Sequence, residues 1–212
     1  MNPYRDKSYS FPGRIINSDE CVENHSLIRS ICDCSNEIYC EIGSGSGEHL
    51  LELGRRNPKA AFFGFELRFK RAVRTIEKAK RDSVENVYVL RMDARKLDEI
   101  FSNIKLSAVY VNFPDPWPKT KQRRHRILNT AFMHTCLDRL KTGGFLSVKT
   151  DHEEYFKSFL DLAKSFHNFS ILEETFDIYG SEFIANNIST EFEKLFVHQE
   201  KPIYYAKLVV VS

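Results

Sequence analysis

Residues 39–50, YCEIGSGSGEHL, decide the fold. An apolar strand pattern runs through Glu41, three glycines follow at positions 43, 45 and 47, and a helical pattern begins directly afterwards. Because glycine has no Cβ, a ligand can press against such a turn, and the first N–H groups of the next helix attract anionic or polar atoms. The stretch therefore predicts a strand, a tight turn and a helix, with a ligand at the turn.

Short apolar runs alternate with helical patterns outward from this stretch. The predicted strands span 37–43, 61–66, 86–93, 107–113, 143–150 and 169–175, followed by an antiparallel edge strand in 201–212. The predicted helices lie near 22–32, 47–56, 67–81, 95–101, 125–140, 152–167 and 190–198. This alternation is typical of βαβ units, so we expect an α/β fold with a mostly parallel, seven-stranded sheet and helices on both faces.

The composition is that of an ordinary globular protein. The chain has 212 residues, of which 42% are apolar and 28% charged. That length suits one core, so we expect a single domain over 1–212, with an N-terminal arm over 1–30 that is weakly patterned and partly mobile, and a catalytic core over 31–212. No apolar run approaches the ~20 residues of a membrane span and no signal peptide is visible, which predicts a soluble, cytoplasmic protein.

The cysteines and the charges exclude some classes of site. Five cysteines form an odd set without a C-x-x-C pair, which predicts reduced thiols and no metal site. The net charge of +2 is too small to indicate a nucleic-acid partner by itself. Cations are nevertheless clustered in 68–81, for which a solvated helix face and phosphate binding both stay open, and in 119–126.

The glycine pattern argues against a dinucleotide. A G-x-G-x-x-G fingerprint needs a third glycine at position 48, where this chain has Glu48, an acid in the path of a pyrophosphate. A G-x-G-x-G turn preceded by Glu41 instead resembles the Rossmann-like methyltransferases that use S-adenosyl-L-methionine. That cofactor has an ammonium and a sulfonium group and no phosphate, so a carboxylate is favourable there.

Three more acids stand at successive strand ends. Glu66, Asp93 and Asp115 each follow the preceding acid after one predicted βα unit, so they are expected at one edge of the sheet. The position of Glu66 suits the two ribose hydroxyls, and the resemblance places Asp93 beside the adenine. For Asp93 a simple helix cap is an equally open alternative.

The most specific signal is NFPDPWPKTKQRRHRI, residues 112–127. Together with the cofactor pattern, STEFE at 189–193 and KPIYY at 201–205, it resembles the tRNA (guanine-N7-)-methyltransferases, and the resemblance runs from about Ile38 to the C-terminus. It implies methyl transfer from S-adenosylmethionine to N7 of a variable-loop guanine in tRNA. The prolines stiffen the segment that presents Asp115 and Trp117, for which a pocket wall is preferred over a core position.

The resemblance also assigns the site residues. For the cofactor these are Glu41, Gly43, Gly45, Gly47, Glu66, Asp93 and Asp115, and Asp115 is also the catalytic residue. Facing the substrate are Lys119, Asp151, Thr190, Glu191, Phe192 and Glu193, while RNA contacts are Lys121, Arg123, Arg124, His125 and Arg126. It implies no metal and tRNA as the partner, in a monomer or homodimer without an obligatory second subunit.

The chain departs from the family pattern at several positions. Lys121 and Gln122 replace an arginine and a histidine, Leu195 replaces a basic residue, and Glu200 replaces a glycine. Two other classes stay open: a methyltransferase for small molecules or proteins, which would not need the cations of 119–126, and a non-catalytic RNA-binding module, which would not need the cofactor residues.

Overall fold

The computed structural model describes residues 2–18 and 21–211, and for residues 21–23 the backbone alone. The chain divides between Leu106 and Ser107 into two compact units, which are described separately below. A single catalytic domain therefore stays a prediction.

The first unit is a parallel α/β layer structure. Its strands are β1 (Ile15–Asn17), β2 (Ile38–Ile42), β3 (Ala61–Phe65) and β4 (Val87–Arg91), in the order β1-β4-β3-β2, and neighbouring strands run parallel. Its helices are α1 (Pro3–Ser8), α2 (Cys21–Asp33), α3 (Glu48–Arg56), α4 (Phe69–Arg81), the 3₁₀ turn η1 (Ala94–Lys96) and α5 (Leu97–Ile100). The short α1 and β1, within the N-terminal arm, were not predicted, because three to six residues give too little periodicity to detect.

Helices cover both faces of β3, all of whose residues are buried. On one face Gly64 makes room for α3, since a Cβ there would lie 2.7 Å from Cδ2 of Leu50. On the other face the ring of Phe63 packs edge-on against Phe101, which follows α5, at 5.3 Å. Burial on both faces explains why the strand is a continuous apolar run rather than an alternating one.

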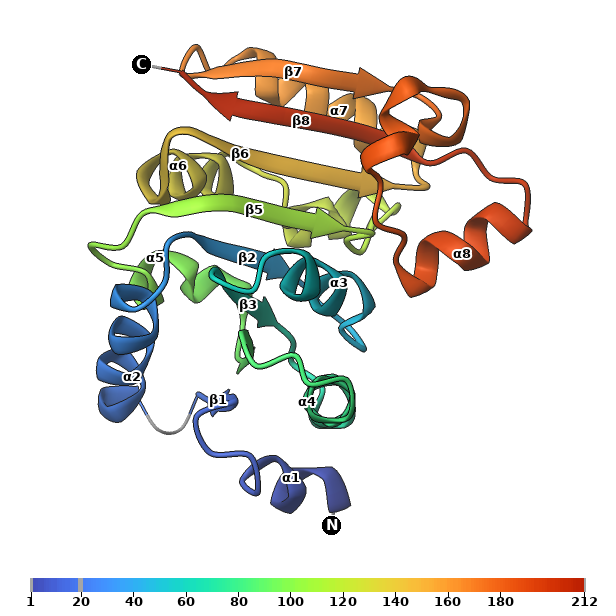
Figure 1. Cartoon of the computed structure of the whole chain (residues 1–212). Helices are drawn as coiled ribbons and strands as arrows, with labels where there is room; N and C mark the ends of the chain where they lie inside the picture. Colours follow the sequence, from blue (N-terminus) through green and yellow to red (C-terminus); the bar gives the residue numbers. More distant parts are fainter. Residues whose placement is uncertain (1, 19–20, 212) are drawn as a thin grey trace. The chain divides into compact units, whose positions relative to one another are not determined.

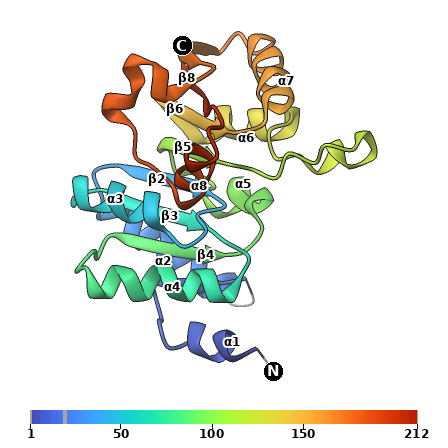
Figure 2. The ribbon, with the colours of Figure 1, turned by 90° about the vertical axis from the view of Figure 1, so that its right-hand side faces the viewer.

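Helix α4 lies between β4 and α1 (Figure 2). Its apolar side, with Ala72, Val73 and Ile76, packs on β1 and β4, and Tyr4 and Phe11 of the N-terminal segment pack against the same cluster. The N-terminal arm is thus an integral part of the first unit over the residues described.

The second unit contains antiparallel strand pairs, unlike the first (Figure 1). Its strands are β5 (Leu106–Asn112), β6 (Leu140–Thr150), β7 (Phe169–Thr175) and β8 (Tyr204–Val210), in the order β5-β6-β8-β7. Its helices are η2 (Thr120–His125), α6 (Thr130–Arg139), α7 (Glu153–Lys164), η3 (Ile178–Gly180), η4 (Glu182–Asn186) and α8 (Glu191–His198).

Three sequence expectations need correction here. The last strand is antiparallel as predicted, but β8 pairs with both β6 and β7 and is therefore interior, not an edge. The strands of residues 2–18 and 21–211 number eight, one more than predicted, because β1 was missed. The helix predicted over 125–140 is shorter at its start: α6 begins at Thr130, where Asn129 caps it by accepting a hydrogen bond from the Phe132 N–H, and His125 belongs to η2.

Within the second unit, helix α7 packs on the sheet through aromatic side chains. The buried Phe156 stacks on Tyr204 of β8, with ring centroids 5.5 Å apart, and Tyr155 and Phe159 are buried beside it. His152 begins this helix, its Nδ1 accepting a hydrogen bond from the Tyr155 N–H. Within the described part of the chain, no helix has the length and apolar character that crossing a membrane requires.

Candidate active site

The glycine-rich turn between β2 and α3 has the conformation that its sequence predicts. Gly43, Gly45 and Gly47 all have positive φ, at 71°, 58° and 78°. At Gly47 a Cβ would also lie 2.4 Å from Cγ2 of Thr75, so glycine is required there twice over. At Gly43 a Cβ would meet nothing within 4 Å, which leaves open space above the turn.

Helix α4 holds the backbone of this turn from the side. The hydroxyl of Thr75 donates to the Gly45 carbonyl at 3.3 Å, and Nζ of Lys78 donates to the Ser46 carbonyl at 3.1 Å. These contacts hold the loop in place and offset the large loss of backbone entropy that ordering its glycines requires. Sequence reasoning missed both residues, since neither lies near the glycines along the chain.

Glu41 is buried at the end of β2. Its side chain is 3% exposed, and Oε1 lies 3.2 Å from Nδ1 of His49 in the first turn of α3. His49 was assigned no function from the sequence, and the structure makes it the residue that fixes the Glu41 carboxylate. A buried carboxylate requires such a partner because its desolvation is costly.

Glu66 and Asp93 lie at the ends of the neighbouring strands β3 and β4. Oε1 of Glu66 accepts a hydrogen bond from the Arg68 N–H at 2.8 Å, and Oε2 lies 4.0 Å from the Arg71 guanidinium. Since β2, β3 and β4 are parallel, these acids and Glu41 occupy the same edge of the first unit.

Asp93 has the capping contacts that the sequence left as an alternative. Its Oδ1 accepts from the Arg95 N–H at 2.9 Å to cap η1, and the Arg95 guanidinium is bound to both carboxylate oxygens. The side-chain hydrogen bond from Arg95 holds the pKa of Asp93 below its usual range. A role beside the adenine stays a prediction.

In the second unit the FPDPWP segment follows β5 with a strained backbone. Phe113 and Trp117 both have positive φ, at 51° and 40°, which is uncommon for bulky side chains. The segment is tied to β6 by the hydrogen bond from the Phe113 N–H to the Lys149 carbonyl, at 2.8 Å. Asp115, between the two strained residues, is exposed. Strain of this kind persists only where surrounding contacts hold it, and it gathers at functional sites.

Arg126 provides one of those contacts. Its Nε donates to the Pro116 carbonyl at 2.7 Å, its guanidinium pairs with Glu154 of α7, and it lies over the Tyr155 ring at 4.5 Å. The hydrogen bond from Arg126 lowers the pKa of Glu154 to about 2. With its side chain 7% exposed, Arg126 supports the FPDPWP segment from inside, which the sequence reasoning did not foresee.

The other cations of this run lie on the surface. Lys119 precedes η2, and Lys121, Arg123, Arg124 and His125 are exposed along it. Arg123 also approaches Glu154, at 3.3 Å, and the ring of Trp117 lies against His125 at 5.4 Å.

Asp151 and the start of α8 complete the predicted substrate residues. Asp151, just after β6, is partly exposed and lies 3.6 Å from Nζ of Lys201. Thr190 is the buried N-cap of α8, while Glu191 and Phe192 are exposed in its first turn. Phe196, one turn further along, packs against Phe113 of the strained segment with ring centroids 5.4 Å apart.

Glu193 has a different position from the one expected of a substrate ligand. It is fully buried, and its Oε2 accepts from Nζ of Lys149 at 2.8 Å and from the Thr190 N–H. Its Oε1 accepts from the Tyr179 hydroxyl and from Nδ2 of Asn187. Both oxygens are thus used within the protein, and as it lies the residue presents neither of them to a substrate.

Lys149 is a further residue of the candidate site that the sequence analysis missed. It is 3% exposed, and besides Glu193 its Nζ donates to Oδ1 of Asn187 at 2.7 Å and to the Ile188 carbonyl at 2.9 Å. Lys149 thus connects β6 to α8 through Glu193, and to the segment before α8 through Asn187 and Ile188. Its only sequence signal is a lysine within the otherwise uncharged run of residues 142–150, two residues before Asp151.

Comparison with known proteins places this arrangement in a family. A family model described as "Putative methyltransferase" matches residues 35–206. The tRNA (guanine-N(7)-)-methyltransferase of Brevibacillus brevis is 33% identical over 170 residues, which cover 80% of this chain and 79% of the relative. The chain belongs to this methyltransferase family.

Members of the family from other bacteria give a consistent result. The tRNA (guanine-N(7)-)-methyltransferase of Bacillus subtilis is 31% identical, covering 82% of this chain and 80% of its own length. A bifunctional glycosyltransferase/methyltransferase of Fusobacterium nucleatum is 37% identical over 98% of this chain, which spans only 32% of that longer protein.

Solved structures support the fold. An antibiotic-related methyltransferase matches with a TM-score of 0.64 at 15% identity, covering 88% of this chain and 94% of that chain. An rRNA methylase of Streptococcus thermophilus matches with a TM-score of 0.57 at 13% identity, covering 89% and 96%. The chain therefore has the Rossmann-like α/β fold of methyltransferases, as predicted.

Proposed function

We propose that this protein transfers the methyl group of S-adenosylmethionine to N7 of a variable-loop guanine in tRNA, forming 7-methylguanosine. The observation that supports this most is the strained FPDPWP segment with Asp115 exposed at its centre, in a chain that is 33% identical to a tRNA (guanine-N(7)-)-methyltransferase over 79% of that relative. The strain indicates that the segment is held in place for a purpose beyond packing.

The residues of the first unit fit the proposed cofactor. Open space above Gly43 leaves room for a ligand against the turn, and the acids at the ends of β2, β3 and β4 suit a cationic amino acid and a ribose. A protein of Streptococcus mutans with the same fold, TM-score 0.57, was solved in complex with SAH. A phosphate-containing cofactor fits less well, because Glu41 and Glu48 flank the turn.

S-adenosylmethionine supplies an electrophilic methyl group when it is bound. In our proposal Gly43, Gly45 and Gly47 let its amino acid end approach the backbone, and Glu41 favours its ammonium. Glu66 accepts hydrogen bonds from the ribose hydroxyls through the oxygen that faces Arg71 at 4.0 Å, and Asp93 lies beside the adenine.

The residues of the second unit act on the base. Guanine N7 has a lone pair and no proton, so no general base is needed at the nucleophile. A positive charge develops on the purine during the transfer. Hydrogen bonds from its N1–H and amino group to carboxylates become stronger as this charge develops. We assign this role to Asp115 and Asp151. We withdraw Glu193 from it, because its oxygens are bound to Lys149, Tyr179 and Asn187.

The exposed cations of η2 provide RNA contacts in this proposal. Lys121, Arg123, Arg124 and His125 bind phosphates, and Lys119 positions the RNA beside the base, while Glu191 and Phe192 face the substrate. Arg126 is a positioning residue, since its guanidinium is bound to Pro116 and Glu154. Thr190 acts as the cap that places α8.

We further propose that residues 1–212 act as one methyltransferase domain, with 31–212 as its catalytic core, as a monomer or homodimer without an obligatory second subunit. A tRNA substrate implies action in the cytoplasm. Because the name of the Fusobacterium relative does not specify a methyl acceptor, the acceptor is what must be measured.

The test is transfer of a labelled methyl group from S-adenosylmethionine to unmodified tRNA, followed by digestion to nucleosides. We expect the label in 7-methylguanosine, and a loss of about 10²-fold or more in turnover for Asp115→Ala. Asp161→Ala, which removes an exposed acid of α7, serves as the matched control and should retain turnover. Label in another nucleoside, or near wild-type turnover of the Asp115 variant, would contradict the assignment.

A further inference from the structure

Helix α4 is much more positively charged than the chain as a whole. Over Phe69–Arg81 the helix has six cations and one acid, Glu77, so its net charge is +5, whereas the whole chain has +2. Four of the cations, Lys70, Arg74, Lys78 and Arg81, recur at intervals of four, four and three residues. They therefore follow one face of the helix, which we call the α4 stripe.

The α4 stripe is unfavourable for the isolated helix. Like charges four residues apart, as in the pairs Lys70–Arg74 and Arg74–Lys78, repel each other and destabilise a helix. Other helices of this protein place an acid at that spacing instead. Arg29 of α2 pairs with Asp33, Arg56 of α3 with Glu52, and Lys157 of α7 with Glu153.

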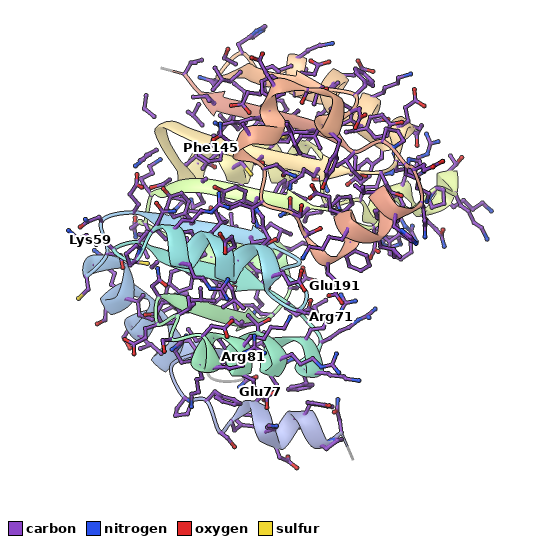
Figure 3. The ribbon with its side chains drawn as sticks, turned by 45° about the vertical axis from the view of Figure 1, so that its right-hand side comes forward. Lys59, Arg71, Glu77, Arg81, Phe145 and Glu191 are labelled. Carbon is purple, nitrogen blue, oxygen red and sulfur yellow. The ribbon has the colours of Figure 1, made fainter. Side chains whose placement is uncertain are left out.

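The single acid of α4 does not offset the stripe. Glu77 is bound to Lys7 of α1, and Figure 3 shows it on the α1 side of the helix, while Arg71 and Arg81 extend from near its two ends. Arg81 pairs with Asp82 beyond the helix. Arg74 has no anionic partner among the residues that the structure describes, and Lys70 faces only the Tyr4 ring, at 5.7 Å.

The stripe is adjacent to the candidate cofactor turn of the same unit. Lys78 belongs to both, since its Nζ is bound to the Ser46 carbonyl. Arg71, beside the stripe, lies 4.0 Å from Glu66 and within 4.0 Å of the point where a Cβ on Gly45 would lie. An anionic polymer on the stripe would thus lie next to the cofactor turn.

We propose that the α4 stripe binds backbone phosphates of the RNA substrate, as a contact surface additional to η2. This inference rests on the proposed function. Phosphate binding needs cations and no apolar centre, whereas protein interfaces have an apolar core. None of the large, exposed apolar side chains belongs to α4, which favours RNA over an acidic protein surface.

The test compares tRNA binding by Arg74→Gln and by Lys70→Gln/Arg74→Gln with binding by the control Lys59→Gln/Lys164→Gln. The control removes two exposed cations elsewhere, from the loop before β3 and from the end of α7. For the stripe double variant, the slope of log K against log salt should become shallower by about 1.4–1.8, as for two lost phosphate contacts. The KM for tRNA should rise, while the KM for S-adenosylmethionine and kcat at saturating tRNA stay unchanged.

Each outcome decides the matter. A stripe variant that keeps its thermal stability, tRNA affinity and salt slope at the control's values overturns the proposal. The same result together with lost retention on polyglutamate would assign the stripe to an acidic protein partner instead. Wild-type protein that neither binds nor methylates tRNA would overturn the proposed function as well, whereas normal methylation with unchanged stripe variants overturns only this inference.

Discussion

The buried pair of Lys149 and Glu193 gives the strongest test of the site's construction. In Glu193→Ala, the Lys149 ammonium loses its carboxylate partner at 2.8 Å while it stays 3% exposed. Removing one member of a buried ion pair costs about 3–5 kcal/mol. The Tyr179, Asn187 and Thr190 donors lose their acceptor as well, so we expect the upper part of this range.

The size of this loss is large against the ~5–15 kcal/mol by which domains are stable. Urea unfolding, followed by circular dichroism, measures it as a lower midpoint. The double variant Lys149→Met/Glu193→Leu removes both charges, so it should lose less than the sum of the two single variants, by about 2 kcal/mol. Glu193→Gln keeps the shape and should lie between wild type and Glu193→Ala.

Two results would refute this reasoning. One is a decrease of less than about 1 kcal/mol in the free energy of unfolding for Glu193→Ala, since breaking a buried ion pair destabilises a protein by more than that. The other is strict additivity in the double variant. If Glu193 instead contacts the base, Glu193→Gln would reduce kcat strongly at unchanged stability, whereas a purely structural role predicts that activity and stability fall together.

Two further predictions concern the turn and the Arg126 contact. Gly47→Ala should cost about 1–3 kcal/mol, because its φ is 78° and its Cβ would collide with Thr75 at 2.4 Å. Gly43→Ala, with open space, should cost only the left-handed conformation, about 1 kcal/mol; equal costs in urea unfolding would contradict the clash. For Glu154, paired with Arg126, the folded pKa of about 2 lies below the ordinary 4.5. The contribution of the Glu154 carboxylate to the stability of the fold is therefore full above pH 4.5 and lost as the pH falls toward 2. The Tm difference between wild type and Glu154→Gln should shrink over that range, and a constant difference would exclude this linkage.

Much of the fold was evident from local pattern. The strands at 38–42, 61–65 and 87–91 have strong apolar runs. The glycines at 43, 45 and 47 indicate the turn, because glycine adopts a positive φ without strain wherever it stands. Where prediction failed, the signal was short or non-local. Strand β1 has three residues, and the interior position of β8 depends on pairing with β7, which no periodicity encodes.

The candidate site shows the same division. Its family, its glycine turn and the acids at the strand ends were determined by the sequence alone, because residue type and spacing are enough to specify a strand end or a left-handed turn. The tertiary structure decided which charged residues are available for chemistry. Lys149 and Glu193 are 44 residues apart in the chain and Arg126 and Glu154 are 28 apart. Burial removes water as a competing partner for Lys149, Glu193 and Arg126, and only the folded chain shows this burial. Glu193 and Arg126 therefore belong to the protein's framework, while Asp115 stays exposed.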